Sequence, residues 1–269
     1  MKNLLGLLAS GIASIGVLSA AEPANKPKFA GSFDTLVADS YTSAGGFTVQ
    51  GGNVSQSTLT LGVQNAIRPG DYLSVCGWVN LSRDFKGGLR DKTMEGDVII
   101  GYNSGPAFQL FKGAVSLNTD FQYWDYPNRF MGEHDMVTDF GASWTRGEKI
   151  PLTLSANWRH LFPRKDVTPG DYMHLSAATS VPLFTLGKKN KSWKVALNPE
   201  MNAVLSRKFY LPGEDWNLRP FVSLGLTAPK ENLSFRVGAG YNLNLDNDPL
   251  VQVAKPRQSL FQAGINYKF

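Results

Sequence analysis

The sharpest hint of catalysis in the sequence is the pair His174 and Ser176. A histidine that accepts the proton of a serine hydroxyl can turn that serine into a nucleophile for acyl transfer. In an extended chain, side chains two positions apart point to the same side, so the two residues share one face. Met173, Leu175 and Ala177 occupy the other, apolar face. We therefore expect a polar pair here, assign no catalytic residue and predict that the chain is not an enzyme.

Other residue types that bind metals or form redox centres are weakly placed. His134 and Asp135 follow Glu133, but one histidine beside two acids is a common loop composition. The segment 246–248 offers carboxylate and amide oxygens without the glycine and distant glutamate of an EF-hand loop. Cys76 is the single cysteine, so no disulfide can form within the chain. The sequence predicts neither a metal site nor a cofactor.

Composition and the N-terminus limit the class of protein. The chain has 269 residues, a formal net charge of +5, 42% apolar and 12% aromatic residues, which is unlike a disordered chain. Lys2, an apolar run through Leu18 and the small residues up to Ala21 form the pattern of a secretory signal peptide. We predict a cleaved signal at 1–21, a short periplasmic leader at 22–28 and one domain at 29–269.

After the signal, apolar and polar residues alternate with a period of two. Over 233–243 one face reads Leu, Phe, Val, Ala, Tyr, Leu, and the other reads Ser, Arg, Gly, Gly, Asn. This period is typical of β-strands. Most of the runs are long enough for a tilted strand to cross a bilayer, which takes about 9–11 residues. Twelve strands are predicted, at 29–41, 56–66, 71–82, 92–102, 112–126, 134–146, 151–162, 171–183, 192–207, 216–228, 231–245 and 257–269.

The predicted connections alternate between long and short along the chain. Transmembrane barrels show this asymmetry, with short periplasmic turns and longer outside loops, and the even strand count places both termini at the short-turn end. The long connections are 42–55, 83–91, 127–133, 163–170, 208–215 and 246–256, and the short ones are 67–70, 103–111, 147–150, 184–191 and 229–230. We therefore predict an all-β fold, a closed antiparallel transmembrane β-barrel of about twelve strands in up-and-down meander order.

Alternation alone also fits a soluble sandwich, so the direction of the two faces decides the class. The apolar faces are nearly unbroken, and aromatic residues fall near strand ends, where membrane barrels carry interfacial girdles. The opposite face mixes small residues with charges that a water-filled lumen tolerates. The aromatic residues are Trp144, Trp158, Trp193, Trp216, Tyr267 and Phe269. The candidate lumen and selectivity residues are Glu95, Asp97, Asp120, Asp139, Arg159, Lys194, Glu200, Arg219 and Arg236.

Two family resemblances follow from these residues. The ending 263–269, with Phe261, Tyr267 and the terminal Phe269, resembles the last strand of Gram-negative outer-membrane β-barrels and porin-like proteins, which the barrel-assembly machinery reads. Fragments around Tyr41, Glu95–Asp97 and 123–127 are similar to the TorF porin family, although 42–47 departs from its arginine- and glycine-containing segment. Outer-membrane lipid hydrolases also carry a His-x-Ser pair, but on the lipid-facing side and followed by an Asn-Gly stretch that 177–179 lacks.

The function predicted from these observations is a narrow passive pore for small solutes or ions in the outer membrane of a Gram-negative cell. A plugged barrel that works as a structural or surface-interaction protein is the alternative, and a lipid-modifying hydrolase using His174 and Ser176 is a less favoured one. Expected partners are outer-membrane lipids, lipopolysaccharide and the barrel-assembly machinery. We expect a monomer and no nucleic-acid binding.

Overall fold

The computed structural model is a closed antiparallel barrel whose wall has twelve strand positions. It describes residues 26–42, 48–82, 93–127, 134–163, 169–188, 191–207, 214–245 and 257–269. Neighbouring strands follow one another in chain order, and β10 pairs with both β8 and β11 to continue the wall. The predicted twelve-stranded meander is confirmed, with one extra strand, β9. The strands are β1 (Lys28–Thr42), β2 (Thr48–Gln64), β3 (Tyr72–Ser82), β4 (Thr93–Leu110), β5 (Gly113–Asp125), β6 (His134–Arg146), β7 (Leu152–Leu161), β8 (Gly170–Thr179), β9 (Val181–Leu186), β10 (Trp193–Arg207), β11 (Glu214–Thr227), β12 (Leu233–Asn244) and β13 (Arg257–Lys268).

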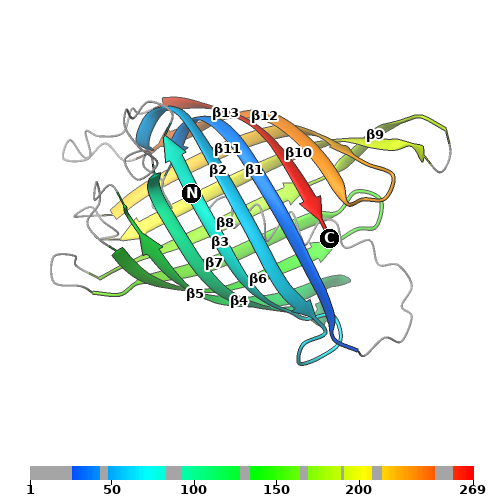
Figure 1. Ribbon diagram of the computed structural model, residues 1–269, viewed down its shortest axis with the longest axis horizontal. Coiled ribbons are helices and arrows are strands. Elements are labelled where there is room, and N and C mark those ends of the chain that lie inside the picture. The colour runs from blue at the N-terminus through cyan, green and yellow to red at the C-terminus, as the bar shows by residue number, and fades with distance from the viewer. Residues whose placement is uncertain are drawn as a thin grey trace.

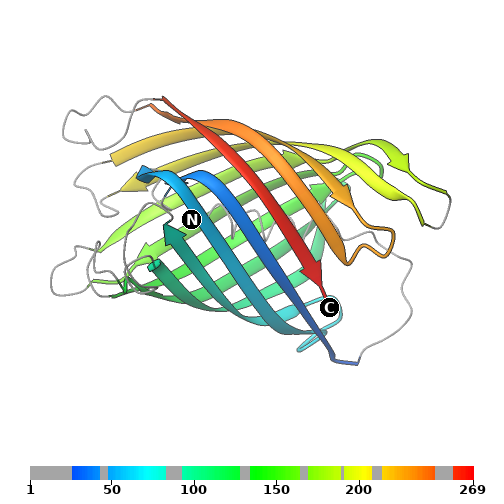
Figure 2. The same cartoon turned by 45° about the horizontal axis from the view of Figure 1, so that its top comes forward.

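The barrel closes where the last strand meets the first. β13 pairs with β1 from Ser32 opposite Lys268 to Ala38 opposite Gln262. Figure 1 and Figure 2 show the two strands side by side, crossing the barrel at a steep tilt. Beyond the ladder, Gly31 and Phe269 exchange two backbone hydrogen bonds of 2.9 Å. The start of β1 and the end of β13 therefore lie together at the end that carries the short turns, as the even strand count predicts.

Three predicted connections are too long, and two of them lie beside β2 and β4. The connection predicted at 42–55 is shorter, because β2 begins at Thr48 and its first residues pair with the end of β1 through irregular register. The connection predicted at 103–111 is mostly strand, since β4 runs to Leu110 and only two residues, Phe111 and Lys112, make the turn. Gly51, Gly52 and Pro106 interrupt the apolar alternation without ending the strands, which explains both errors.

A bulge in β4 stands where a turn was predicted. The register shifts on both sides of Pro106, whose nitrogen has no hydrogen to donate to the ladder. Gly105 has a positive φ of 59°, and a Cβ on it would lie 2.0 Å from the Gly70 carbonyl oxygen. Only a glycine fits this close approach of β4 to the β2–β3 turn.

The eighth predicted strand, 171–183, is interrupted and longer than predicted, so the connection predicted at 184–191 begins too early. β8 ends at Thr179, Ser180 donates a hydrogen bond to Asn198 Oδ1 at 2.7 Å, and β9 continues to Leu186. In the strand order β9 is terminal and pairs with β10, and Figure 1 shows it at the turn end beyond its neighbours. Among the described strands, β9 therefore has one edge that pairs with no neighbouring strand.

The turn between β2 and β3 is held by one carboxylate. Asp71 accepts hydrogen bonds from the backbone N–H groups of Ala66, Ile67 and Arg68 at 2.7–3.0 Å, and from the Tyr102 hydroxyl at 3.2 Å. Burial alone raises the pKa of Asp71, but these four donors outweigh it and hold the pKa below the usual value of an aspartate. The turn is therefore most stable with Asp71 ionised.

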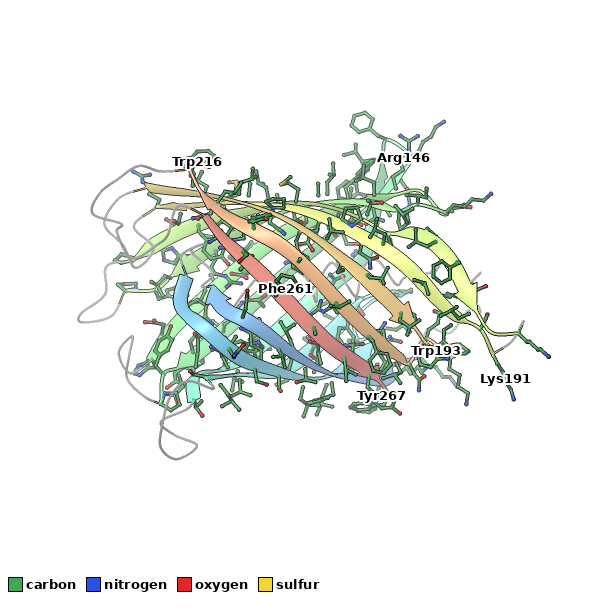
Figure 3. The ribbon with its side chains drawn as sticks, turned by 90° about the horizontal axis from the view of Figure 1, so that it is seen from above. Arg146, Lys191, Trp193, Trp216, Phe261 and Tyr267 are labelled. Carbon is green, nitrogen blue, oxygen red and sulfur yellow. The ribbon has the colours of Figure 1, made fainter. Side chains whose placement is uncertain are left out.

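The outside of the barrel is mostly apolar, whereas the inside holds the buried charged and polar side chains together with some apolar ones. Outward side chains such as Val75, Ile100 and Phe261 are exposed by 52%, 53% and 60%, whereas inward neighbours such as Asp97 and Asn80 are buried. Figure 3 shows Trp216 near one end of the barrel, Trp193 and Tyr267 near the other, and Phe261 between them. The described residues form no helix that is both long and apolar enough to span a membrane.

Candidate functional site: the inner wall of the barrel

Most of the predicted lumen charges lie on the inner wall. On each strand the residues beside them point outward, as Val98 does beside Asp97 and Phe121 beside Asp120. The inward group comprises Glu95, Asp97, Asp120, Asp139, Arg159, Glu200, Arg219 and Arg236. Lys194 differs, because it is exposed and forms an ion pair with Glu231 at the turn-end rim. It therefore does not belong to the inward group.

A row of three charges crosses β5, β6 and β7. Asp120 lies opposite Asp139 in the register, and Asp139 lies opposite Arg159. The Arg159 guanidinium donates two hydrogen bonds to the two oxygens of Asp139. Gln122 Nε2 donates to Asp120 Oδ1 at 2.5 Å and to Asp139 Oδ2 at 3.2 Å. One arginine and one amide thus offset the repulsion between two adjacent carboxylates.

Two aromatic rings flank the arginine of this row. The Arg159 guanidinium carbon lies 5.7 Å from the ring centroid of Trp124 and 5.1 Å from that of Tyr172. Cation–π attraction acts at these distances. Trp124 Nε1 also donates to Gln122 Oε1 at 2.9 Å. These contacts connect the two rings, the Gln122 amide and the Arg159–Asp139 ion pair along the wall.

The other two arginines also have partners on the wall. Arg236 Nη2 lies 3.7 Å from Asp34 Oδ1, reaching across β13 from β12 to β1. Gly264 on β13 leaves room for this approach, because a Cβ there would lie 3.3 Å from Arg236 Nε. Arg219 Nε donates to Asn242 Oδ1 on the adjacent strand at 3.0 Å. Among these contacts, the pair of Arg159 with Asp139 joins two of the predicted lumen charges.

The possible catalytic pair lies inside the barrel. His174 and Ser176 point inward, whereas Met173 and Leu175 are exposed on the outer face, as the alternation predicts. His174 Nε2 shares a hydrogen bond of 2.7 Å with Asn202 Oδ1, and Asn202 Nδ2 donates to Glu200 Oε1 at 2.7 Å. The Ser176 hydroxyl lies 2.5 Å from that of Ser155. Each member of the pair is thus hydrogen-bonded to a residue of an adjacent strand.

Uncharged polar groups fill another part of the wall. Asn118 Nδ2 on β5 donates to Asn157 Oδ1 on β7 at 3.1 Å. The two side chains meet over Gly141 of β6, where a Cβ would lie 1.8 Å from Asn157 Oδ1. Small residues at inward positions therefore let polar groups on alternate strands reach each other.

Several inward polar residues were missed from the sequence. Asp34 and Asp135 are both inward, and the Tyr126 hydroxyl donates to Asp135 Oδ2 at 3.0 Å. Their positions within the predicted strands could have identified them, because alternate residues of a strand point to the same face. For Asp34 that signal is weakened by Leu36 and Ala38, which are apolar and also point inward.

The described residues include some of the other predicted sites but not all of them. Within the described residues no group of three or more histidine, cysteine or acidic side chains could hold a metal ion. The segment 246–248, the signal peptide at 1–21 and the first part of the leader lie outside the described residues. Of the predicted assembly signal, Phe261, Tyr267 and Phe269 are all exposed on the outer face, and the last two rings stack at 6.3 Å.

The fold and the inner wall define a β-barrel with an apolar outer face and a charged interior. No family model matches the chain, and no curated protein matches it. The predicted likeness to TorF proteins is therefore not shown by these comparisons.

Several solved structures share the barrel architecture. An outer-membrane channel from Pseudomonas putida F1 is 11% identical over 93% of this chain and 97% of that chain, with a TM-score of 0.47. The beta domain of the Bordetella autotransporter BrkA is 8% identical over 90% and 98%, with a TM-score of 0.43. The TodX monoaromatic hydrocarbon channel is 11% identical over 97% and 93%, with a TM-score of 0.39. We draw no functional conclusion from these distant likenesses.

Proposed function

We propose that this protein is an outer-membrane β-barrel that acts as a narrow passive channel for small solutes or ions. The outer surface supports the membrane location, because large apolar side chains are exposed all around the wall and aromatic residues lie at both ends. Burying that surface in lipid removes it from water, whereas leaving it exposed would favour aggregation. The closed ladder meets the demand for paired backbone groups in lipid.

The direction of the interior contacts carries the proposal of a channel. Asp139–Arg159, Asn118–Asn157, His174–Asn202, Arg219–Asn242 and Asp34–Arg236 each join strands that are adjacent or separated by one. These side chains therefore lie along the wall instead of bridging opposite walls. A polar wall whose charges are satisfied laterally leaves the barrel axis available to water and small solutes.

One feature favours the second candidate, a plugged structural barrel. Trp124, Tyr126, Val137, Leu161, Tyr172 and Val204 form an apolar cluster of buried residues on the inner wall of β5–β10. If this cluster extended across the axis, it would close the barrel and leave the loops as the working surface. Electrical recording separates the two candidates, since a plugged barrel gives no ion current.

The proposal is tested by placing cysteines on the two faces of β7. In a Cys76→Ser background, Ser155→Cys lies on the inner wall and Ala156→Cys on the outer face. A small charged methanethiosulfonate added to reconstituted protein should lower the current through Ser155→Cys and leave Ala156→Cys unchanged. A current that is equally insensitive in both variants would contradict a water-filled lumen.

The remaining parts of the proposal concern export and chemistry. Residues 1–21 would direct the chain to the periplasm and be removed, and the barrel-assembly machinery would then insert a monomeric barrel. Outer-membrane lipids and lipopolysaccharide would surround it. We propose no catalysis, because His174 and Ser176 point into the barrel, away from an acyl chain in the surrounding lipid.

A further inference from the structure

The inner wall carries more negative than positive charge. Among the described residues that point inward, seven carboxylates face three guanidinium groups, a formal balance of −4. The described residues in and beside the turns are instead mostly basic, with Lys112, Arg146 and Lys191 among them, and they are not counted in this balance. The carboxylates are Asp34, Glu95, Asp97, Asp120, Asp135, Asp139 and Glu200, and the guanidinium groups are Arg159, Arg219 and Arg236. This excess is opposite in sign to the +5 of the whole chain.

The inward carboxylates are concentrated on one part of the wall. Five of the seven carboxylates lie on three adjacent strands, β4, β5 and β6, and Asp120 and Asp139 face each other directly in the register. Like charges opposite each other in a ladder destabilise a sheet, and burying charge is costly. Here the repulsion is offset by Gln122 and Arg159 and is not removed. Such a cost in folding free energy is expected where the charges act on ions that pass through the lumen.

The charges of the inner wall that remain partly accessible also have a negative balance. Arg159 and Arg219 are each only 2% exposed and are held along the wall by Asp139 and Asn242. Asp120 and Glu200 are partly accessible. The other five inward carboxylates are buried as well, so an ion that travels along the axis would meet two partly accessible carboxylates and one partly accessible guanidinium group, that of Arg236.

We propose that the lumen selects small cations over anions, with Asp120 and Glu200 as specificity-determining residues. This inference rests on the proposed channel function. Charged side chains that line a pore set its ion preference, since they raise the local concentration of the opposite charge. The effect weakens as the salt concentration rises, because the Debye length falls from about 10 Å at 0.1 M to about 3 Å at 1 M.

The test is the reversal potential of the purified barrel in a planar bilayer with potassium chloride at different concentrations on the two sides. A reversal potential with the sign of potassium selectivity supports the inference. A zero or chloride-selective reversal potential, with normal conductance, overturns the inference and leaves the channel standing. The absence of any conductance overturns the channel, and the selectivity with it.

Two matched double variants assign the selectivity to residues. Asp120→Asn with Glu200→Gln removes two inner-wall carboxylates, and we expect the potassium-to-chloride permeability ratio to fall by about threefold or more. Asp125→Asn with Glu148→Gln removes two exposed carboxylates outside the inner wall, one on the outer face of β5 and one in the β6–β7 turn, and should leave the ratio unchanged. Heat-dependent gel mobility confirms that both variants form closed barrels. Equal ratios in the two variants would overturn the assignment.

Discussion

Asp139 and Arg159 lie opposite each other on β6 and β7, and the two side chains point into the barrel with two hydrogen bonds between them. Both side chains are less than 10% exposed. The Arg159 guanidinium also lies over the rings of Trp124 and Tyr172. A single cross-strand pair thus connects the charged row to the aromatic part of the inner wall.

Breaking this pair should destabilise the barrel strongly. Arg159→Ala leaves Asp139 beside Asp120 without its cationic partner, and removal of one member of a buried ion pair costs about 3–5 kcal/mol. Urea unfolding of the refolded protein in lipid vesicles measures the loss. Lys194→Ala is the control, because its exposed pair with Glu231 contributes at most about 1 kcal/mol. Similar losses in the two variants would contradict the importance of the inner row.

The bulge in β4 should tolerate no side chain at Gly105. Gly105→Ala places a Cβ against the Gly70 carbonyl at a positive φ, and such a strained conformation costs about 1–3 kcal/mol before any steric term. Gly77→Ala is the matched control, since a Cβ there meets nothing within 4 Å. The free energy of unfolding should fall for the first variant and stay within about 0.5 kcal/mol for the second. A stable Gly105→Ala barrel would show that the bulge can rearrange.

Much of this barrel could be predicted because a period of two reports directly on the two faces of a strand. The direction of Phe261 and the inward position of His174 follow from it, whereas the order of the strands was predicted from the alternating long and short connections. Residues without a strong polarity hide the pattern, which is why β2 near Gly51 and β4 near Pro106 were placed wrongly. The period of two also does not show which side chains pair with each other. That Arg236 meets Asp34 across β13 depends on closure of the barrel and on the absence of a side chain at Gly264.

The turn between β2 and β3 should make stability depend on pH. The folded pKa of Asp71 is lowered, below the usual value of about 3.9. The contribution of the ionised carboxylate is therefore complete above the unfolded pKa and is lost as the pH falls through the folded pKa. The difference in unfolding free energy between the natural protein and Asp71→Asn should be constant above about pH 5 and shrink below about pH 4. A difference that does not change across this range would show that the charge of Asp71 has no role.

The terminal residue should matter for assembly more than for the finished barrel. Phe269 exchanges backbone hydrogen bonds with Gly31, while its ring is 61% exposed on the outer face. We expect Phe269→Ala to reduce the amount of barrel inserted in cells and to leave in vitro refolding unchanged. Phe235→Ala, another outward aromatic residue at 37% exposure, is the control. Equal insertion of the two variants would contradict an assembly signal at the C-terminus.

The central claim is that the interior of this barrel conducts. Its most direct test is single-channel recording of the natural sequence from residue 22 onward, refolded and shown to be a closed barrel by heat-dependent gel mobility. The lateral pairing of the inner-wall charges predicts discrete current steps, smaller than those of wider 16–18-stranded porins. A homogeneous, closed barrel that inserts into the bilayer and gives no steps would contradict the channel and favour the plugged alternative.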